Sequence, residues 1–201
     1  IAGAVSDLSW TDDNQKIVVV GAGTKRAAVI NIETKANAGD IQVGHSQTLL
    51  TCAVKTPKPY QVVAGGEDKE VHAYKGVPFK HEKSIQKMHT GFVTKVAFNP
   101  WDQGASFFSV SQDKTFKAYD SSSYEVTLEK TGLHSMGIQD LAFSKNENEL
   151  ITCSSDRSVK TWKLNLEAKT LEDGKVLQLP KADVDGIKDN VEKQQLGLAY
   201  Q

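Results

Sequence analysis

Three segments of the chain share one pattern: Glu-Asp-Lys-Glu-Val-His-Ala-Tyr at 67–74, Gln-Asp-Lys-Thr-Phe-Lys-Ala-Tyr at 112–119 and Ser-Asp-Arg-Ser-Val-Lys-Thr-Trp at 155–162. In each segment an Asp precedes an aromatic residue by six positions, which pairs Asp68 with Tyr74, Asp113 with Tyr119 and Asp156 with Trp162. Successive Asp positions are 45 and 43 residues apart. A repeat of about 40–45 residues that contains four short strands is typical of one blade of a β-propeller. We therefore predict an all-β fold of repeated four-stranded blades.

Short apolar runs separated by turn residues support this prediction. The unit after residue 87 offers four candidate strands, at Val93–Phe98, Ser106–Val110, Thr115–Tyr119 and Tyr124–Leu128, and the next unit ends with Val176–Leu179. The best helical candidate is Asp183–Gln195, and its polar composition favours a loop. We expect blades at about 1–43, 44–87, 88–132 and 133–180, and the start of a further blade at 194–201. Four blades and part of a fifth make an arc of a seven-bladed ring.

Composition narrows the classes of function. The net charge is −1 and the charged residues are interspersed, so no basic face predicts nucleic-acid binding. No apolar run is long enough to span a bilayer, and no membrane partner is expected. Cys52 and Cys153 are isolated within apolar runs, which indicates free thiols and a cytoplasmic protein. The chain opens on Ile1 without a charged and apolar leader, which suggests an internal piece of a longer polypeptide.

A histidine precedes the first expected strand of three units: His45, His89 and His134, at intervals of 44 and 45 residues. A hydroxyl residue lies four positions before the Asp in two of these units. Together these residues predict a buried hydrogen-bonded structural clasp in each of the two units, formed by His89, Ser109, Asp113 and Tyr119 and by His134, Thr152, Asp156 and Trp162. The unit of Asp68 has Ala64 at the hydroxyl position, so its clasp is expected to be incomplete.

The combination of His, Asp and Ser also invites a hydrolase interpretation. A catalytic site is built once in a domain, whereas this set recurs once in every repeat, so we favour a structural role and predict that the protein is not an enzyme. The same argument applies to metals, because each His belongs to a different blade and no cluster has the spacing of metal ligands.

The run Ile-Val-Val-Val-Gly-Ala-Gly at 17–23 resembles the start of a dinucleotide-binding loop. Such a loop needs Gly or Ala at position 26, where this chain has Arg26, and a helix must follow. The next residues, Ala28–Ile32, have the composition of a strand instead. We predict a glycine-containing turn between two strands and no cofactor.

Three further motifs carry a family resemblance. The repeats resemble those of the WD40 family, and three segments resemble motifs of the actin-interacting protein 1 family: Gly-Ala-Val-Ser-Asp-Leu-Ser-Trp at 3–10, Gly-Val-Pro-Phe-Lys at 76–80 and Gln-Gln-Leu-Gly at 194–197. They occur in the order and at the separations of that family. The resemblance implies the middle of the N-terminal of two seven-bladed propellers, in a non-enzymatic cytoplasmic protein of the actin cytoskeleton. It also implies that the protein binds actin filaments and assists cofilin, the actin-depolymerising factor, in disassembling them.

Propellers bind partners through the loops at the ends of their strands. The candidate partner-binding residues are Lys25, Glu67, Asp68, Phe79, Lys80 and His81. The family usually carries acidic residues near position 25 and an aromatic at position 81, so Lys25 and His81 alter the expected surface.

Several of these residues have a second interpretation. Phe79 could be an exposed anchor or could pack between blades, and Asp68 could belong to its incomplete clasp. Lys25, Lys80 and His81 could be solvated charges. Trp101 follows Pro100 in a turn, where it could anchor a partner or cover the neighbouring blade. A generic WD40 scaffold for another protein assembly is the alternative function.

Overall fold

The computed structural model describes residues 3–23, 26–39, 41, 44–76, 79–145 and 148–178, and within these residues it contains strands and turns but no helix. The strands of this part of the chain are β1 (Val5–Trp10), β2 (Lys16–Gly21), β3 (Ala27–Asn31), β4 (Asn37–Gly39), β5 (Leu49–Val54), β6 (Gln61–Gly66), β7 (Val71–Lys75), β8 (Lys80–Ile85), β9 (Val93–Phe98), β10 (Ser106–Ser111), β11 (Phe116–Asp120), β12 (Val126–Lys130), β13 (Ile138–Phe143), β14 (Glu149–Ser154), β15 (Ser158–Asn165) and β16 (Thr170–Gln178).

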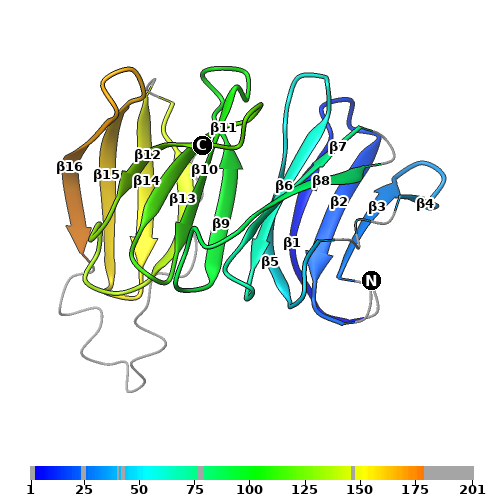
Figure 1. Cartoon of the computed structure of the whole chain (residues 1–201), viewed down its shortest axis with the longest axis horizontal. Coiled ribbons are helices and arrows are strands. Elements are labelled where there is room, and N and C mark those ends of the chain that lie inside the picture. The colour runs from blue at the N-terminus through cyan, green and yellow to red at the C-terminus, as the bar shows by residue number, and fades with distance from the viewer. Residues whose placement is uncertain are drawn as a thin grey trace.

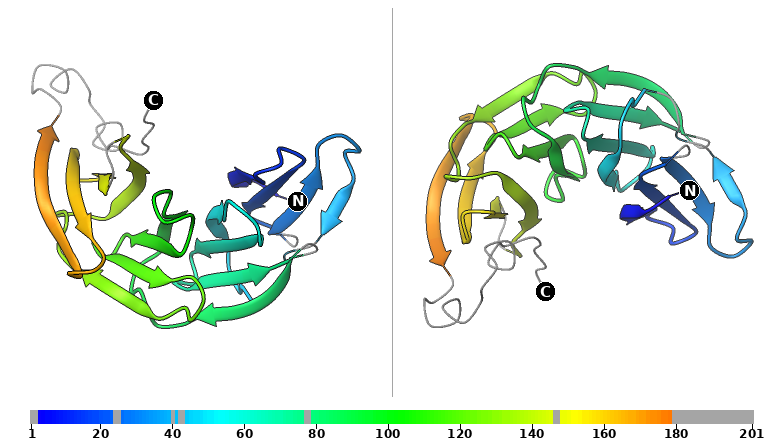
Figure 2. Two further views of the ribbon diagram at one scale, coloured as in Figure 1. Left: turned by 90° about the horizontal axis from the view of Figure 1, so that it is seen from above. Right: turned by 90° about the horizontal axis from the view of Figure 1, so that it is seen from below.

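Consecutive strands pair antiparallel in groups of four, which gives a first sheet (β1–β4), a second (β5–β8), a third (β9–β12) and a fourth (β13–β16). The sheets stand side by side (Figure 1). Seen from above or below, they follow an open arc whose inner side carries the first strand of each sheet (Figure 2). Neighbouring inner strands contact one another along this side. This is the arrangement of successive propeller blades, and the predicted fold class is confirmed.

Burial along the strands follows from this stacking of sheets. The middle strands β6 and β10 are buried at every residue, because neighbouring sheets cover both of their faces. The outermost strand β16 is exposed along most of its length. Apolar side chains therefore concentrate in the middle strands, where burial removes the most apolar surface from water.

The core consists of three clusters, and each lies between two neighbouring sheets. The first cluster joins the first and second sheets through residues such as Val18, Val62 and Tyr74. Another joins the second and third sheets and includes a stacked pair, Phe107 and Tyr119, with ring centroids 4.7 Å apart. The remaining cluster packs Phe108 and Phe116 of the third sheet with Leu150 and Trp162 of the fourth. Cys52 and Cys153 are buried free thiols, as the sequence predicted.

The fourth strand of the third sheet differs from the prediction. The strand β12 begins at Val126, whereas the sequence predicted a strand from Tyr124. Tyr124 lies in the preceding turn with φ 63°, and its buried side chain reaches the second sheet, where the Gln61 amide donates to its hydroxyl at 2.9 Å. The Tyr124 side chain therefore packs between the second and third sheets and is not part of a strand. Similarly, β16 begins at Thr170, well before the predicted start at Val176, because β15 and β16 form a long hairpin.

The glycine-containing turn after β2 is part of a hairpin. The Gly21 N–H donates to the Arg26 carbonyl at 2.7 Å, and β2 pairs antiparallel with β3. A dinucleotide-binding loop instead leads into a helix. The candidate helix at Asp183–Gln195 and the predicted further blade at 194–201 lie outside the described residues. No membrane-spanning helix occurs in the part of the chain that the structure describes.

Candidate functional site

The turns that follow the middle strands are held by histidine-centred networks. In the third sheet, His89 lies before β9 and reaches three side chains. Its Nε2 is 2.6 Å from the Ser109 hydroxyl, and its Nδ1 is 3.2 Å from the Asp113 carboxylate and 2.8 Å from the Thr115 hydroxyl. The Ser109 oxygen is also 3.1 Å from the Tyr119 hydroxyl. The structure therefore brings the four residues of this predicted clasp together.

The fourth sheet repeats this network with different side chains. His134 Nε2 is 2.8 Å from the Thr152 hydroxyl, and His134 Nδ1 is 3.1 Å from the Asp156 carboxylate. The Trp162 indole N–H donates to the Thr152 oxygen at 2.8 Å. Here too the predicted clasp residues meet, with Ser158 as an additional partner of His134.

Charge in these networks is stabilised by hydrogen bonds. Burial raises the pKa of Asp156, but the Ser158 hydroxyl and the backbone N–H of Ser135 donate to its carboxylate and bring the pKa down to about 2. Burial lowers the pKa of His134. The negative charge of Asp156 acts in the opposite direction but does not cancel this shift. The lowered pKa of Asp156 keeps its carboxylate ionised, and the lowered pKa of His134 favours the neutral imidazole.

The Ser109, His89 and Asp113 side chains form the chain of contacts found in serine hydrolases. However, Ser109 is fully buried and the His89 side chain is covered, so a substrate carbonyl could not approach the hydroxyl. The same arrangement recurs in the next sheet with Thr152. This geometry can cross-link strands and fix turns, but it offers no site for a nucleophilic attack. Among the described residues, no group of three or more His, Cys, Asp or Glu side chains could hold a metal ion.

The second sheet has a different network, because Ala64 supplies no hydroxyl. His45 Nδ1 lies 3.1 Å from the Tyr74 hydroxyl, and Asp68 pairs with another histidine, His72, at 3.0 Å. The His72 Nδ1 then meets the Ser84 hydroxyl at 3.0 Å. Burial, together with a smaller electrostatic effect of the neighbouring His72, lowers the pKa of His45 to about 4.

Sequence reasoning missed His72. The equivalent position holds Lys117 in the third sheet and Lys160 in the fourth, so a histidine here departs from the repeat. That departure coincides with the missing hydroxyl at Ala64 and could have indicated a substitute partner for Asp68.

The structure does not gather the predicted partner-binding residues on one surface. Glu67 and Asp68 lie in the β6–β7 turn, whereas Phe79 directly precedes β8 and Lys80 begins it, at the other end of β7. Asp68 is engaged with His72 and with the Ser46 N–H. Of the two interpretations of Asp68, its geometry matches membership of the turn network.

Of the two interpretations of Phe79, its geometry matches packing between sheets. Phe79 is 4% exposed and packs in the first core cluster, which joins the first and second sheets. Lys80 is exposed, and His81 is half-buried with its Nε2 3.0 Å from the Ser84 hydroxyl. Trp101 packs edge-on against Phe143 of the fourth sheet, with ring centroids 5.3 Å apart, so it covers the neighbouring sheet. Lys25 lies outside the described residues.

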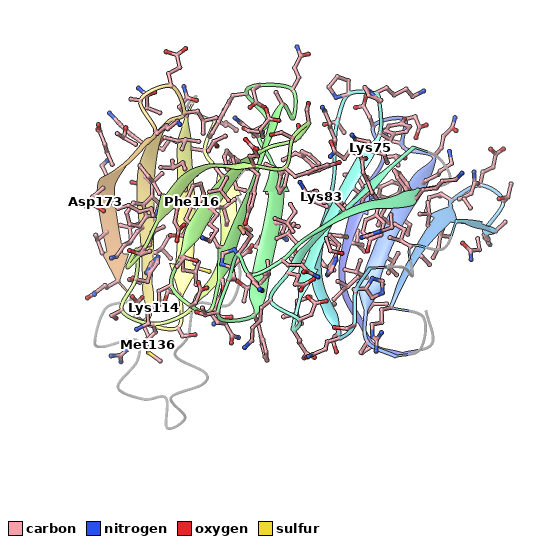
Figure 3. The ribbon with its side chains drawn as sticks, viewed as in Figure 1. Lys75, Lys83, Lys114, Phe116, Met136 and Asp173 are labelled. Atoms are coloured by element: carbon pink, nitrogen blue, oxygen red, sulfur yellow. The ribbon has the colours of Figure 1, made fainter. Side chains whose placement is uncertain are left out.

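One end of the arc carries the turns β6–β7, β10–β11 and β14–β15, and we call it the clasp end. Basic residues Lys69, Lys114 and Arg157 occupy equivalent positions of these turns, all exposed and all with φ between 67° and 71°. Beside them, Phe92 and Met136 are 37% and 49% exposed in the segments that lead into β9 and β13. Lys114 and Met136 lie at the lower end of the molecule in Figure 3.

Only some residues of the clasp end could be predicted from the sequence. The Asp of each turn was identified, but the basic residue that follows it was not singled out, although it recurs with the same period. Phe92 and Met136 were missed because an isolated apolar residue near a strand is normally assigned to the core.

These features define the class of protein. Residues 127–163 match the family model described as WD domain, G-beta repeat, and these residues run from β12 to β15. Together with the arc of four-stranded antiparallel sheets, this match makes the protein a WD40-repeat protein with a β-propeller fold.

Comparison with related proteins shows which family of WD40-repeat proteins the chain resembles. The chain is 34% identical over 164 residues to Actin-interacting protein 1 of Drosophila melanogaster, an alignment that covers 81% of this chain and 26% of the relative. It is 30% identical over 203 residues to WD repeat-containing protein 1 of Mus musculus, with 100% and 31% covered. It is 37% identical over 128 residues to Actin-interacting protein 1-2 of Arabidopsis thaliana, with 63% and 20% covered.

The chain is thus a homologue of actin-interacting protein 1, and the family resemblance of its motifs is confirmed. It spans less than a third of the length of these relatives.

Proposed function

We propose that this protein binds actin filaments through the clasp end and assists cofilin in disassembling them. The name of its relative from Drosophila melanogaster supports actin as the partner class. The motifs at 3–10, 76–80 and 194–197 support the role with cofilin, through the family resemblance of the sequence.

The observation that carries this proposal is the combination of charge and apolar surface at the clasp end. Met136 and Phe92 expose large apolar side chains, which dominate binding energy when a partner covers them. The exposed Lys69, Lys114 and Arg157 give this end repeated positive charge, which would steer and orient an acidic partner surface.

The sequence-based contact candidates fit this surface unequally. Glu67 and Asp68 lie at the clasp end, where Asp68 fixes the turn and Glu67 is partly exposed. Lys80 and His81 belong to the outer strand β8 and would form a separate contact region. Lys25 stays a sequence-based candidate. Phe79 would support the β7–β8 connection from within the core.

The clasps would serve this function indirectly. Each one would fix the turn that presents Lys114 or Arg157, because the carboxylate of Asp113 or Asp156 accepts hydrogen bonds from the backbone of its own turn and of the segment before the inner strand. A preorganised loop loses less conformational entropy on binding. We further propose that the protein has no enzymatic activity and needs no cofactor, and that it acts in the cytoplasm at the actin cytoskeleton.

Filament co-sedimentation tests the proposal with the intact protein. Sedimentable actin should fall when both the protein and cofilin are present, and should stay unchanged with the protein alone. If the protein neither pellets with filaments nor changes the pellet in the presence of cofilin, the proposal fails. The protein would then be a WD40 scaffold for another assembly.

A further inference from the structure

A pocket opens at the end of the arc opposite the clasp end, between the third and fourth sheets. It has a volume of about 400 Å³ and is lined by the end of β15 and by residues of the β9–β10, β13–β14 and β15–β16 turns. These turns lie at the upper end of the molecule in Figure 1. The lining residues are Asn99, Trp101, Asp102, Asn148, Leu164, Asn165, Leu166 and Glu167. The pocket is therefore separate from the surface proposed to bind actin.

The charged side chains that are described as lining the pocket are acidic. Asp102 and Glu167 bring two carboxylates, and no Lys, Arg or His occurs among the described residues that line it. Trp101, Leu164 and Leu166 give it apolar walls. A long side chain with a cationic end matches such walls and charges, since its stem can pack on apolar surface while its head meets carboxylates.

Asp102 also has an unused acceptor. One carboxylate oxygen, Oδ2, accepts from the backbone N–H of Ser106 at 3.0 Å and from the Ser106 hydroxyl. The other, Oδ1, is buried and has no hydrogen-bond partner among the described residues. A buried carboxylate oxygen without a donor is unfavourable, and a cationic donor is the partner that would stabilise it most.

The preceding junction shows what can fill such a position. Lys55 follows β5 as Asn99 follows β9, and the two residues make the same backbone hydrogen bond, from Lys55 N–H to the Gln61 carbonyl at 2.7 Å and from Asn99 N–H to the Ser106 carbonyl at 3.0 Å. The Lys55 stem crosses to the third sheet and lies over Gly104, where a Cβ would stand 2.8 Å from its Cγ. A lysine of the chain itself thus covers the junction between the second and third sheets.

Asn99 cannot do the same between the third and fourth sheets. Its side chain is short and turns back into its own loop, where it donates to the Ser106 hydroxyl at 3.1 Å and accepts from the Trp101 N–H at 3.1 Å. The Lys55 side chain fills this position between the second and third sheets, whereas Asn99 leaves the equivalent position between the third and fourth sheets open.

We propose that this pocket binds one basic side chain, best an arginine, of a partner polypeptide. The planar guanidinium has several donors, so it can meet the Glu167 carboxylate near the negative charge of Asp102 while its face lies near the Trp101 ring. The pocket would then be a second contact site, used by a partner at the end of the arc that faces away from the actin surface.

The probe is the blocked tripeptide acetyl-Gly-Arg-Gly-amide, with acetyl-Gly-Glu-Gly-amide as the matched acidic control. The intact protein is labelled with 5-fluorotryptophan, and its ¹⁹F spectrum is followed during titration. The Trp101 signal is assigned as the one missing in Trp101→Phe. The Arg peptide should shift this signal saturably, and the Glu peptide should leave it in place.

Two charge-neutralising variants distinguish the pocket from general attraction. Glu167→Gln should weaken binding of the Arg peptide by about two- to fivefold, as expected for an exposed ion pair. Glu172→Gln makes the same charge change at an exposed position of β16 that does not line this pocket, and it should not alter the affinity. Asp102→Asn should weaken binding further, and the dispersion of the ¹⁹F signals reports whether that variant is folded.

The proposal is overturned if the Trp101 signal does not respond to the Arg peptide or responds equally to the Glu peptide. It is also overturned if Glu167→Gln and Glu172→Gln weaken binding to the same extent, because the attraction would then be general. None of these outcomes depends on actin, so this proposal can fail while the actin-binding proposal stands.

Discussion

The indole N–H of Trp162 donates to the Thr152 hydroxyl across adjacent strands, at 2.8 Å, and the same oxygen lies 2.8 Å from His134 Nε2. One hydroxyl therefore joins the middle strand β14, the next strand β15 and the segment before β13. Trp162 is 1% exposed, so its N–H has no access to water and depends on this single acceptor. Strand pairing and the position of the β14–β15 turn are coupled through Thr152.

The first prediction concerns this hydrogen bond. Trp162→Phe should lower the free energy of unfolding by about 1–3 kcal/mol, because the core loses packing and Thr152 loses a donor. Urea denaturation of the variant and the parent measures the difference. Binding to actin filaments at a temperature where both are folded should be equal. Normal stability with lost binding would show that Trp162 belongs to a partner site instead.

The second prediction concerns pH and His45. Its folded-state pKa of about 4 lies below the value of 6.5 for an unperturbed histidine, so the folded protein binds this proton less readily than the unfolded chain. The stability associated with a neutral His45 is fully present above pH 6.5 and is lost as the pH falls toward 4. The free energy of unfolding should therefore decrease between these two pH values.

His45→Asn serves as the control for this pH dependence. The variant should be less stable at pH 7, where it loses the contact with Tyr74, but its stability should fall less steeply between pH 6.5 and 4. His81, which is partly exposed, also has a pKa lowered by burial and by the electrostatic effect of His72, so some pH dependence of stability will remain. An unchanged slope in His45→Asn would refute the assignment to His45.

The repeat predicted most of the fold, for a physical reason. A blade buries its middle strands on both faces and its turn network must recur at each junction, so apolar runs and the His, Asp and aromatic residues reappear with a period near 44 residues. The positions of His89, Asp113 and Trp162 could be assigned from this period alone. What the period could not predict were contacts between sheets, such as the one from Gln61 to Tyr124.

The candidate partner surface was harder to predict. Phe79 and Met136 are both apolar residues near strand ends, and composition does not distinguish them. Phe79 is buried in the first core cluster, whereas Met136 is left outside because the residues around it are held by the Asp156 network. Exposure at these positions is decided by the path of the backbone in three dimensions.

The third prediction concerns the packing of the second sheet on the third. A Cβ added to Gly65 would lie 2.5 Å from the Val93 Cγ1 and 2.9 Å from its Cβ, closer than van der Waals contact allows. Gly65→Ala should therefore destabilise the protein by about 1–3 kcal/mol through overpacking. Combining it with Val93→Ala should relieve part of this loss. If the double variant shows the sum of the two single effects, the close approach does not cause the destabilisation.

The last prediction concerns the exposed methionine at the clasp end. Met136→Asp should leave stability within about 0.5 kcal/mol of the parent, because the side chain is exposed. If Met136 is a binding anchor, the substitution should weaken co-sedimentation with actin filaments by about tenfold or more. Val126→Asp is the matched control, since Val126 is an exposed apolar residue of the outer strand β12. Equal binding by both variants would place the contact elsewhere, whereas selective loss in Met136→Asp would locate it beside the Asp156 turn.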